Sequence, residues 1–106
     1  MGLLQSNSRT FSANSQTVDL DVRDADAASI QITGTFTATV TFQVSNDGVN
    51  FFNFNGVPTN SATPASSATA AGAWSFDVRP WATLRATTTA YTSGSPVGTL
   101  AGKQQP

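Results

Sequence analysis

Apolar and polar residues alternate in several short stretches of this chain, and that alternation is its strongest structural signal. The sequence QTVDLDV, for example, has apolar residues at Val18, Leu20 and Val22 with polar residues between them. A period of two places successive side chains on opposite faces of a β-strand. We therefore expect strands with one buried and one wet face at residues 16–22, 29–36, 38–44, 50–55, 73–78, 83–91 and 97–101.

The succession of these stretches predicts the fold. Residues that favour turns separate them at short intervals, and no segment shows the period of a helix. Such a pattern is typical of two packed antiparallel layers. We expect an all-β chain, an antiparallel β-sandwich of jelly-roll or immunoglobulin-like type with about seven to eight strands. Its core would hold the inward side chains Val18, Leu20, Val22, Ile30, Ile32, Val40, Phe42, Val44, Trp74, Phe76, Val78 and Leu84.

A tight polar turn followed by three phenylalanines, VSNDGVNFFNF, lies in the middle of the chain. The SNDG sequence favours a hairpin because Asn, Asp and Gly tolerate the positive φ that such turns need. By the alternation, Phe52 and Phe54 share a face and we expect both in the core. Phe51 points the opposite way and is a candidate for contact with a partner.

Three segments lack a sustained pattern and define the expected domain organisation. Residues 1–15 read as an extended N-terminal arm that is ordered only where something holds it. A β-sandwich domain would follow at 16–101, interrupted by a long loop at 57–71 that is rich in proline and small residues. Residues 102–106 read as a polar C-terminal tail. Loops as long as the one at 57–71 are usually functional or disordered.

The composition excludes two classes of partner. Charged residues make up 10% of the chain and its net charge is −1, so the basic stripe of a nucleic-acid-binding protein is absent. No apolar run approaches the roughly 18 residues of a membrane span. The surface is instead wetted by 16 threonines and 12 serines with Asn and Gln. We expect neither a nucleic acid nor a membrane as partner.

The residue inventory also excludes most catalytic arrangements. The chain has no histidine, cysteine or glutamate, so the usual Ser–His and Cys–His nucleophiles cannot form. Asp19 and Asp21 share a strand face about 7 Å apart, which allows a pair of hydrolytic carboxylates. A solvated strand face explains them more simply. We therefore expect no enzymatic activity.

Metal binding has two weak candidates. Asp24 with Asp26, and Asp47 with Asn50, offer the oxygen atoms that calcium prefers. Neither pair belongs to the spaced series of an EF-hand, and both fit turns equally well. We expect no metal and no other cofactor.

Trp81 has two interpretations of equal weight. It follows Pro80, breaks the alternation, and lies near Arg79 and Arg85 in sequence. A tryptophan with neighbouring arginines is typical of an interface anchor, but a tryptophan packed under a sheet edge is just as common. Both interpretations stay open at this stage.

Two stretches resemble a family of small β-rich virion proteins of tailed bacteriophages. They are ITGTFTATVTFQVSNDGVNF at 32–51 and WSFDVRPWATLRATTTAYTSGSPV at 74–97. In that family a hairpin with SNDG is followed by a variable loop, a strand pair that ends in an arginine, and a threonine-rich strand with TAYTSG. Members usually have Val or Ile at the positions of Ala86 and Thr88.

The resemblance implies a structural role in a virion. The expected role is a capsid cement or decoration protein on the capsid exterior, a homotrimer that bridges subunits of the major capsid protein. The alternative is a module of the tail, baseplate or fibre, with host glycan binding as one role there. Candidate contact residues for either role are Arg9, Phe11, Phe51, Arg79, Trp81 and Arg85.

Overall fold

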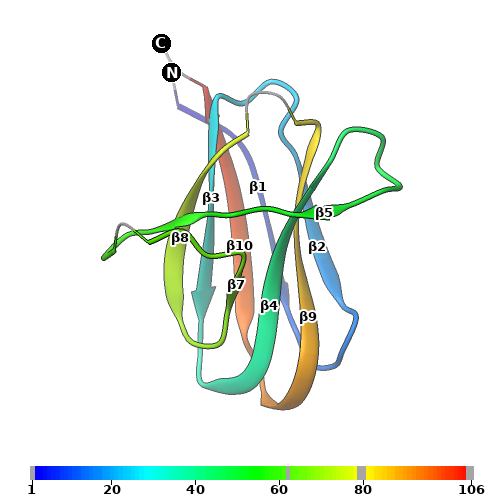
Figure 1. Ribbon diagram of the computed structural model, residues 1–106, viewed down its shortest axis with the longest axis vertical. Helices are drawn as coiled ribbons and strands as arrows, with labels where there is room; N and C mark the ends of the chain where they lie inside the picture. The colour runs from blue at the N-terminus through cyan, green and yellow to red at the C-terminus, as the bar shows by residue number, and fades with distance from the viewer. Residues whose placement is uncertain (1, 62, 79–80, 105–106) are drawn as a thin grey trace.

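The computed structural model describes residues 2–61, 63–78 and 81–104, and this part of the chain is built from ten strands. They form two antiparallel sheets that face each other (Figure 1). The predicted all-β sandwich is therefore confirmed, and no helix in the described ranges could cross a membrane. The strands are β1 Gly2–Thr10, β2 Thr17–Asp21, β3 Ala27–Thr33, β4 Phe36–Ser45, β5 Phe52–Asn53, β6 Val57–Pro58, β7 Ser67–Ala68, β8 Gly72–Asp77, β9 Thr83–Gly94 and β10 Val97–Gln104.

The two sheets use strands from both ends of the sequence. The first sheet has the order β1-β10-β3-β8-β6, and the second has the order β2-β9-β4-β5 with β7 also paired to β4. All pairings are antiparallel. Consecutive strands β2 and β3 thus belong to different sheets, so the chain crosses between the two layers at this connection.

The apolar faces of the two sheets meet in one core. All twelve residues that the alternation predicts for the core are buried, so the prediction is confirmed. At its centre the ring of Phe42 contacts those of Trp74 and Phe76, with centroids 5.2 and 5.3 Å away. Burial of each large side chain stabilises the fold by about 1.5–3 kcal/mol.

The N-terminal segment, expected as an extended arm that is ordered only where something holds it, is an edge strand of the first sheet. Strand β1 pairs with β10 from Gly2 to Thr10, and the expected C-terminal tail continues β10 as far as Gln104. The side chains of residues 6–10 are exposed. The strand has no buried face at these residues, and its backbone hydrogen bonds to β10 hold it in place. Without a buried face, the sequence shows no alternation of apolar and polar residues.

Side chains of β1 also cover the open edge of the second sheet. The amide of Asn7 donates to the carbonyl oxygen of Asp19 at 3.0 Å, and the guanidinium of Arg9 donates to that of Thr17 at 2.9 Å. Both acceptors lie on β2, which pairs with β9 along its other edge. Occupied edge carbonyls are not available to another strand, so this edge is protected against aggregation.

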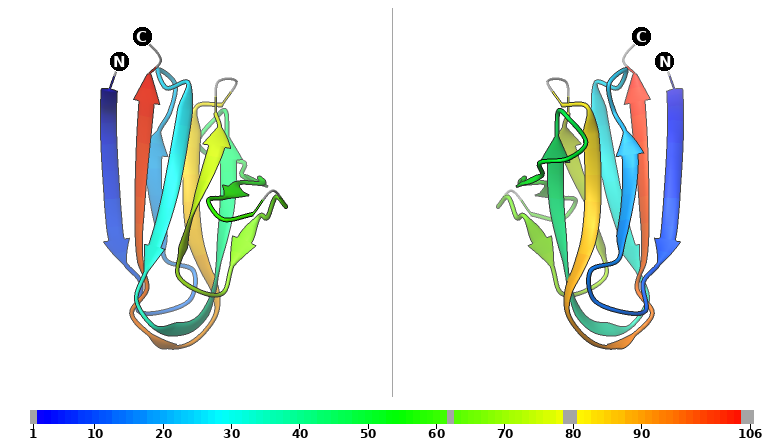
Figure 2. Two further views of the ribbon diagram at one scale, coloured as in Figure 1. Left: turned by 90° about the vertical axis from the view of Figure 1, so that its left-hand side faces the viewer. Right: turned by 90° about the vertical axis from the view of Figure 1, so that its right-hand side faces the viewer.

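The opposite side of the sandwich is closed by the chain between β5 and β7. This chain leaves the second sheet at β5, crosses to the first sheet at β6, and returns at β7 (Figures 1 and 2). The expected loop at 57–71 therefore contains two short strands and a bridge between Gly56 and Ala65. Strands of two residues are too short to show alternation, which is why the sequence read as a loop.

Phe52 and Phe54, which follow the hairpin turn, differ in burial although alternation places them on the same face. Phe52 is paired with the buried Val44, as the alternation predicts, yet it is 63% exposed. The expectation that Phe52 is a core residue is wrong because β5 lies at the sheet edge, beyond the reach of the first sheet. Phe54 packs partly against the core, with its ring stacked 6.0 Å from that of Phe76.

Candidate functional site

The outer face of the second sheet carries polar side chains in register. Strand pairing places Arg85 directly between Asp19 and Gln43, and Gln43 opposite Asn53. The next row consists of Thr17 on β2, Thr87 on β9, Thr41 on β4 and Ser67 on β7. Because alternate residues of a strand share a face, these eight side chains form one surface, which we call the polar face.

Arg85 is fixed at the centre of the polar face. Its Nε and Nη2 donate to the two carboxylate oxygens of Asp19 at 2.7 and 3.0 Å, and its guanidinium lies 3.6 Å from the centre of the Phe51 ring. The Arg85 side chain is only 24% exposed. Such bidentate and stacked contacts orient an arginine more firmly than a single bond does. Beside it, the Gln43 amide donates to Asn53 Oδ1 at 3.2 Å.

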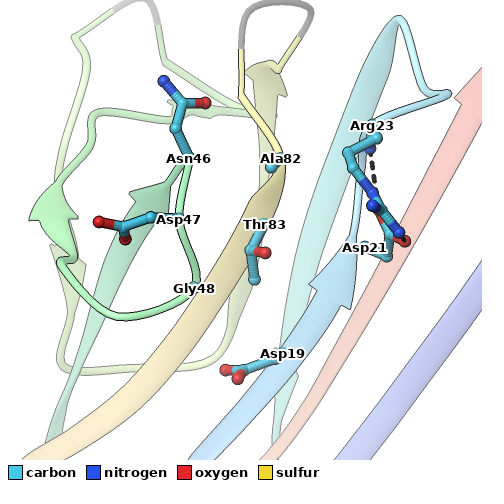
Figure 3. Close-up of a pocket in the computed structure, with 8 residues that line it drawn as sticks. All are labelled: Asp19, Asp21, Arg23, Asn46, Asp47, Gly48, Ala82 and Thr83. Atoms are coloured by element: carbon cyan, nitrogen blue, oxygen red, sulfur yellow. Dashed lines mark hydrogen bonds and ion pairs between the residues drawn. The ribbon is translucent and has the colours of Figure 1, made fainter.

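A cleft of about 390 Å³ opens at one end of the polar face. Figure 3 shows the side chains of Asp19 and Thr83 between the loop that follows β4 and the end of β2. The residues that line the cleft are Asp19, Asp21, Arg23, Asn46, Asp47, Gly48, Ala82 and Thr83. It offers hydrogen-bond donors and acceptors from three separate segments of the chain.

One wall of the cleft is an ion pair between neighbours in sequence. Arg23 Nη2 donates to Asp21 Oδ2 at 2.6 Å, and the backbone N–H of Arg23 donates to Asp21 Oδ1 at 3.0 Å. These bonds favour the ionised carboxylate and lower the pKa of Asp21 to about 2. Asp21 therefore stays charged at any pH near neutrality.

The other wall is a loop ordered by Asp47. Its carboxylate accepts hydrogen bonds from the backbone N–H groups of Asn50 and Val49 at 2.8 and 2.9 Å, and from the Asn50 amide at 2.8 Å. The Ser45 hydroxyl donates to it at 3.0 Å. Together they hold the pKa of Asp47 well below its usual range. Gly48 adopts a φ of 75°, so the predicted polar turn is confirmed.

The same region also presents exposed apolar side chains. Val49 is 79% exposed, Phe52 63% and Val57 43%, and these are the large apolar residues that stand out from the described surface. All three lie in residues 49–58, which we call the crossing segment because it runs from the second sheet to the first (Figure 1). Its first part is rigid because the Asp47 hydrogen bonds hold the preceding loop.

The predicted contact residues do not gather at one place. Arg9 lies exposed on β1, Phe51 is half-buried beneath Arg85, and Arg79 lies outside the described residues. Phe11 is 0% exposed, so it is a core residue and not a contact residue. The chain turns inward after β1, which places the Phe11 ring against Gly98.

Trp81 is packed against the core and so fits the interpretation of a tryptophan under a sheet edge. Its ring meets that of Phe54 edge-on, with centroids 5.9 Å apart, and it is only partly buried. The remaining exposed part keeps it a candidate contact residue.

Four of the candidate catalytic and metal residues have structural partners. Asp19 binds Arg85, and Asp21 binds Arg23. Asp47 and Asn50 bind each other within their loop. Within residues 2–61, 63–78 and 81–104, no three acidic, His or Cys side chains form a group that could hold a metal ion. What the structure adds is the polar face, because register between strands distant in sequence is not visible in alternation.

Comparison with known proteins identifies the fold. No family model matches the sequence, and no curated protein matches it. The structure is similar to that of the SPBc2 prophage-derived protein YomS, with a TM-score of 0.74 and 16% identity over 92% of both chains. It is also similar to the PBSX exported protein XepA, with a TM-score of 0.76 and 23% identity over 92% of this chain and 37% of that one.

At these identities the likeness shows a shared fold alone. The match covers 92% of YomS but only 37% of XepA. YomS is a prophage-derived protein, and XepA is an exported protein of PBSX. The chain has a β-sandwich fold that both share.

Proposed function

We propose that this chain is a non-enzymatic structural protein of a phage virion, and specifically a cement or decoration protein on the outside of the capsid. In this role it binds the major capsid protein and bridges neighbouring subunits, as a homotrimer. The phage-derived structural neighbours support the association with phages, and the resemblance of residues 32–51 and 74–97 supports the capsid role.

The exposed apolar residues of the crossing segment carry this proposal. Isolated apolar side chains are common on protein surfaces, but here Val49, Phe52 and Val57 lie within nine residues of one another. Large apolar side chains exposed along one segment are candidates for contact with a partner. The sandwich core does not need these side chains, so a partner is the simplest reason for their exposure.

The geometry of the crossing segment suits binding to a preformed surface. The hydrogen bonds of Asp47 hold Val49 at the outer end of a rigid loop, so little conformational entropy is lost on binding. A protein that binds an assembled lattice and not the free subunits stabilises the lattice by mass action. Many weak contacts of this kind are sufficient for a cement protein.

The state of the paired aspartates supports a non-enzymatic role. A hydrolase that uses two carboxylates needs one of them protonated near neutral pH to act as the general acid. Asp21 has its pKa lowered to about 2 by Arg23, and Asp19 already accepts two hydrogen bonds from Arg85. The environment of Asp21 does not favour a proton donor, and Asp19 is engaged in its ion pair with Arg85.

The test is co-sedimentation of the full chain with heads of the parent phage from which this protein is absent. We expect saturable binding to the heads, and a loss of affinity of about tenfold or more for Phe52→Ser, since burial of a phenylalanine contributes about 1.5–3 kcal/mol. Gln31→Ala, an exposed position on the first sheet, is the control and should bind as the unaltered protein does. Binding to isolated tails in place of heads would contradict the capsid role and favour the tail alternative.

The trimer is tested separately by light scattering after size exclusion. The chain has a mass of 11.0 kDa, so the proposal predicts a particle of three times that mass. A monomer at high protein concentration would contradict a trimer in solution.

A further inference from the structure

The polar face differs from the rest of the surface in how its side chains are held. Four planar or charged groups lie in one row across four strands, from Asp19 through Arg85 and Gln43 to Asn53. Neighbouring strands lie about 4.8 Å apart, so the row spans roughly 14 Å. The threonine row beside it is about 7 Å away along the strands. The outcome is a flat array of hydrogen-bonding groups as wide as the sheet.

These groups are preorganised. Arg85 is held by two bonds to Asp19 and by the Phe51 ring, and Gln43 is held by Asn53. None of these bonds uses all the hydrogen-bonding capacity of its partners, because a carboxylate accepts about four bonds and an arginine donates five. A ligand can therefore bond to side chains that are already fixed, at a small entropic cost.

The cleft extends this array into a concave site. Its volume of about 390 Å³ lies within the range typical of small-molecule sites. Asp19 belongs both to the polar face and to the cleft, so the two surfaces are continuous. Arg23 supplies donors, Asp19 supplies acceptors, and the Thr83 hydroxyl supplies both at the floor.

The charges and the polarity of this surface select the class of ligand. Asp19, Asp21 and Asp47 outnumber Arg23 and Arg85, which disfavours nucleic acids and other polyanions. The large exposed apolar residues of the described surface lie on the crossing segment, so the polar face lacks the apolar anchors of a protein interface or a membrane surface. An uncharged ligand with many hydroxyl groups both donates and accepts, as these side chains do.

We propose that the polar face and its cleft bind a neutral saccharide. Sugar hydroxyls donate to Asp19 and accept from Gln43 and Arg85 along the row, and a terminal unit enters the cleft beside Thr83. This proposal does not rest on capsid binding, because Gln43 and Thr83, which test it, lie outside the crossing segment. A virion protein with both surfaces would hold the particle through one and a carbohydrate through the other.

The test uses the full chain on a printed array of neutral oligosaccharides, with sialylated, sulfated and phosphorylated glycans on the same array. The best neutral oligosaccharide is then titrated in solution by calorimetry against the unaltered protein and three variants. Gln43→Ala removes a group from the polar face, and Thr83→Val removes a hydroxyl from the cleft at nearly constant shape. Gln31→Ala is the matched control, since it removes the same amide from the outer face of the first sheet.

We expect binding of a neutral glycan, with affinity reduced about threefold to tenfold by Gln43→Ala and by Thr83→Val, and unchanged by Gln31→Ala. All variants should unfold at similar temperatures. The proposal is overturned if every neutral glycan binds more weakly than about 1 mM, if only charged glycans bind, or if Gln31→Ala weakens binding as much as Gln43→Ala. Loss of head binding in Gln43→Ala, without any saccharide binding, would assign the polar face to a protein contact.

Discussion

Substitution of Phe11 tests whether the N-terminal segment belongs to the folded domain. An arm that is ordered only on a capsid would contribute nothing to the stability of the free protein. In the structure, however, Phe11 is 0% exposed, and its backbone N–H donates to the Pro96 carbonyl at 2.8 Å. The ring lies so close to Gly98 that a Cβ added there would meet it at 3.0 Å. The Phe11→Ala substitution therefore removes a packed core side chain.

The expected cost follows from that burial. Truncation of a buried phenylalanine to alanine lowers the free energy of unfolding by about 3–5 kcal/mol, out of a total of about 5–15 kcal/mol for a domain. With a urea m-value of about 1–3 kcal/mol/M, the midpoint should fall by roughly 1 M or more. The fall in Tm should exceed about 12 °C.

The assay is urea unfolding followed by tryptophan fluorescence, with Phe52→Ala as the matched control. Phe52 is 63% exposed, so the same truncation there should change the free energy of unfolding by no more than about 0.5 kcal/mol. If Phe11→Ala costs less than about 1 kcal/mol, the ring is not packed in solution. The segment is then an arm, and the closed sandwich described above is incorrect.

Three further predictions concern single polar or glycine positions. Asp47→Asn should reduce the loss of stability on acidification. The depressed pKa of Asp47 contributes stability above about pH 4, and this contribution disappears as the pH falls through the folded pKa. The decline in Tm from pH 7 to pH 2 should therefore be smaller in the variant. Thr88→Val should lower the free energy of unfolding by about 1–3 kcal/mol in urea titrations, because the Thr88 hydroxyl is buried and donates to the Ala13 carbonyl at 2.7 Å. Thr87, on the outer face, is the control, and an equal loss in Thr87→Val would refute this reason. Gly94→Ala should lower the Tm more than Gly48→Ala does, because the φ of Gly94 is 94° and a Cβ would lie 2.5 Å from the backbone of Thr35 and Phe36. A Cβ at Gly48, which also has a positive φ, would have nothing within 4 Å. Equal Tm values for the two variants would contradict the steric reason.

Alternation predicted the parts of the fold in which one strand face is buried. Strands β2, β3, β4, β8 and β9 each pack an apolar face on the core, and all of them were expected near their observed positions. The core residues followed from the same pattern, because burial of one face requires apolar residues at every second position. The predicted turn at 45–48 was also visible locally, since its chemistry lies within four residues.

The parts that were missed depend on partners distant in sequence. Strand β1 is held by backbone bonds to β10, nearly a hundred residues later, and exposed side chains leave no pattern. Phe52 lies on the predicted face, but its depth depends on how far the first sheet extends. In the same way, the contact of Arg85 with Asp19 follows from the register of β2 against β9, which no local pattern specifies.

The two surfaces give the molecule separate regions for separate tasks. The polar face lies on the outside of the second sheet. The crossing segment runs from the second sheet to the first on the side away from β1 (Figure 2). The two ends of the described chain lie together where β1 and β10 pair (Figure 1). Gln43 and Thr83 belong to one surface and Phe52 to the other, so variants at these positions separate the two proposals by experiment.

The most direct test of the proposed function is the copy number of this chain in purified virions of the parent phage. Quantitative mass spectrometry against labelled standards measures it relative to the major capsid protein. A cement protein that bridges capsid subunits predicts a copy number comparable to that of the major capsid protein, retained in heads separated from tails. A trace amount found only with the tail would contradict the account.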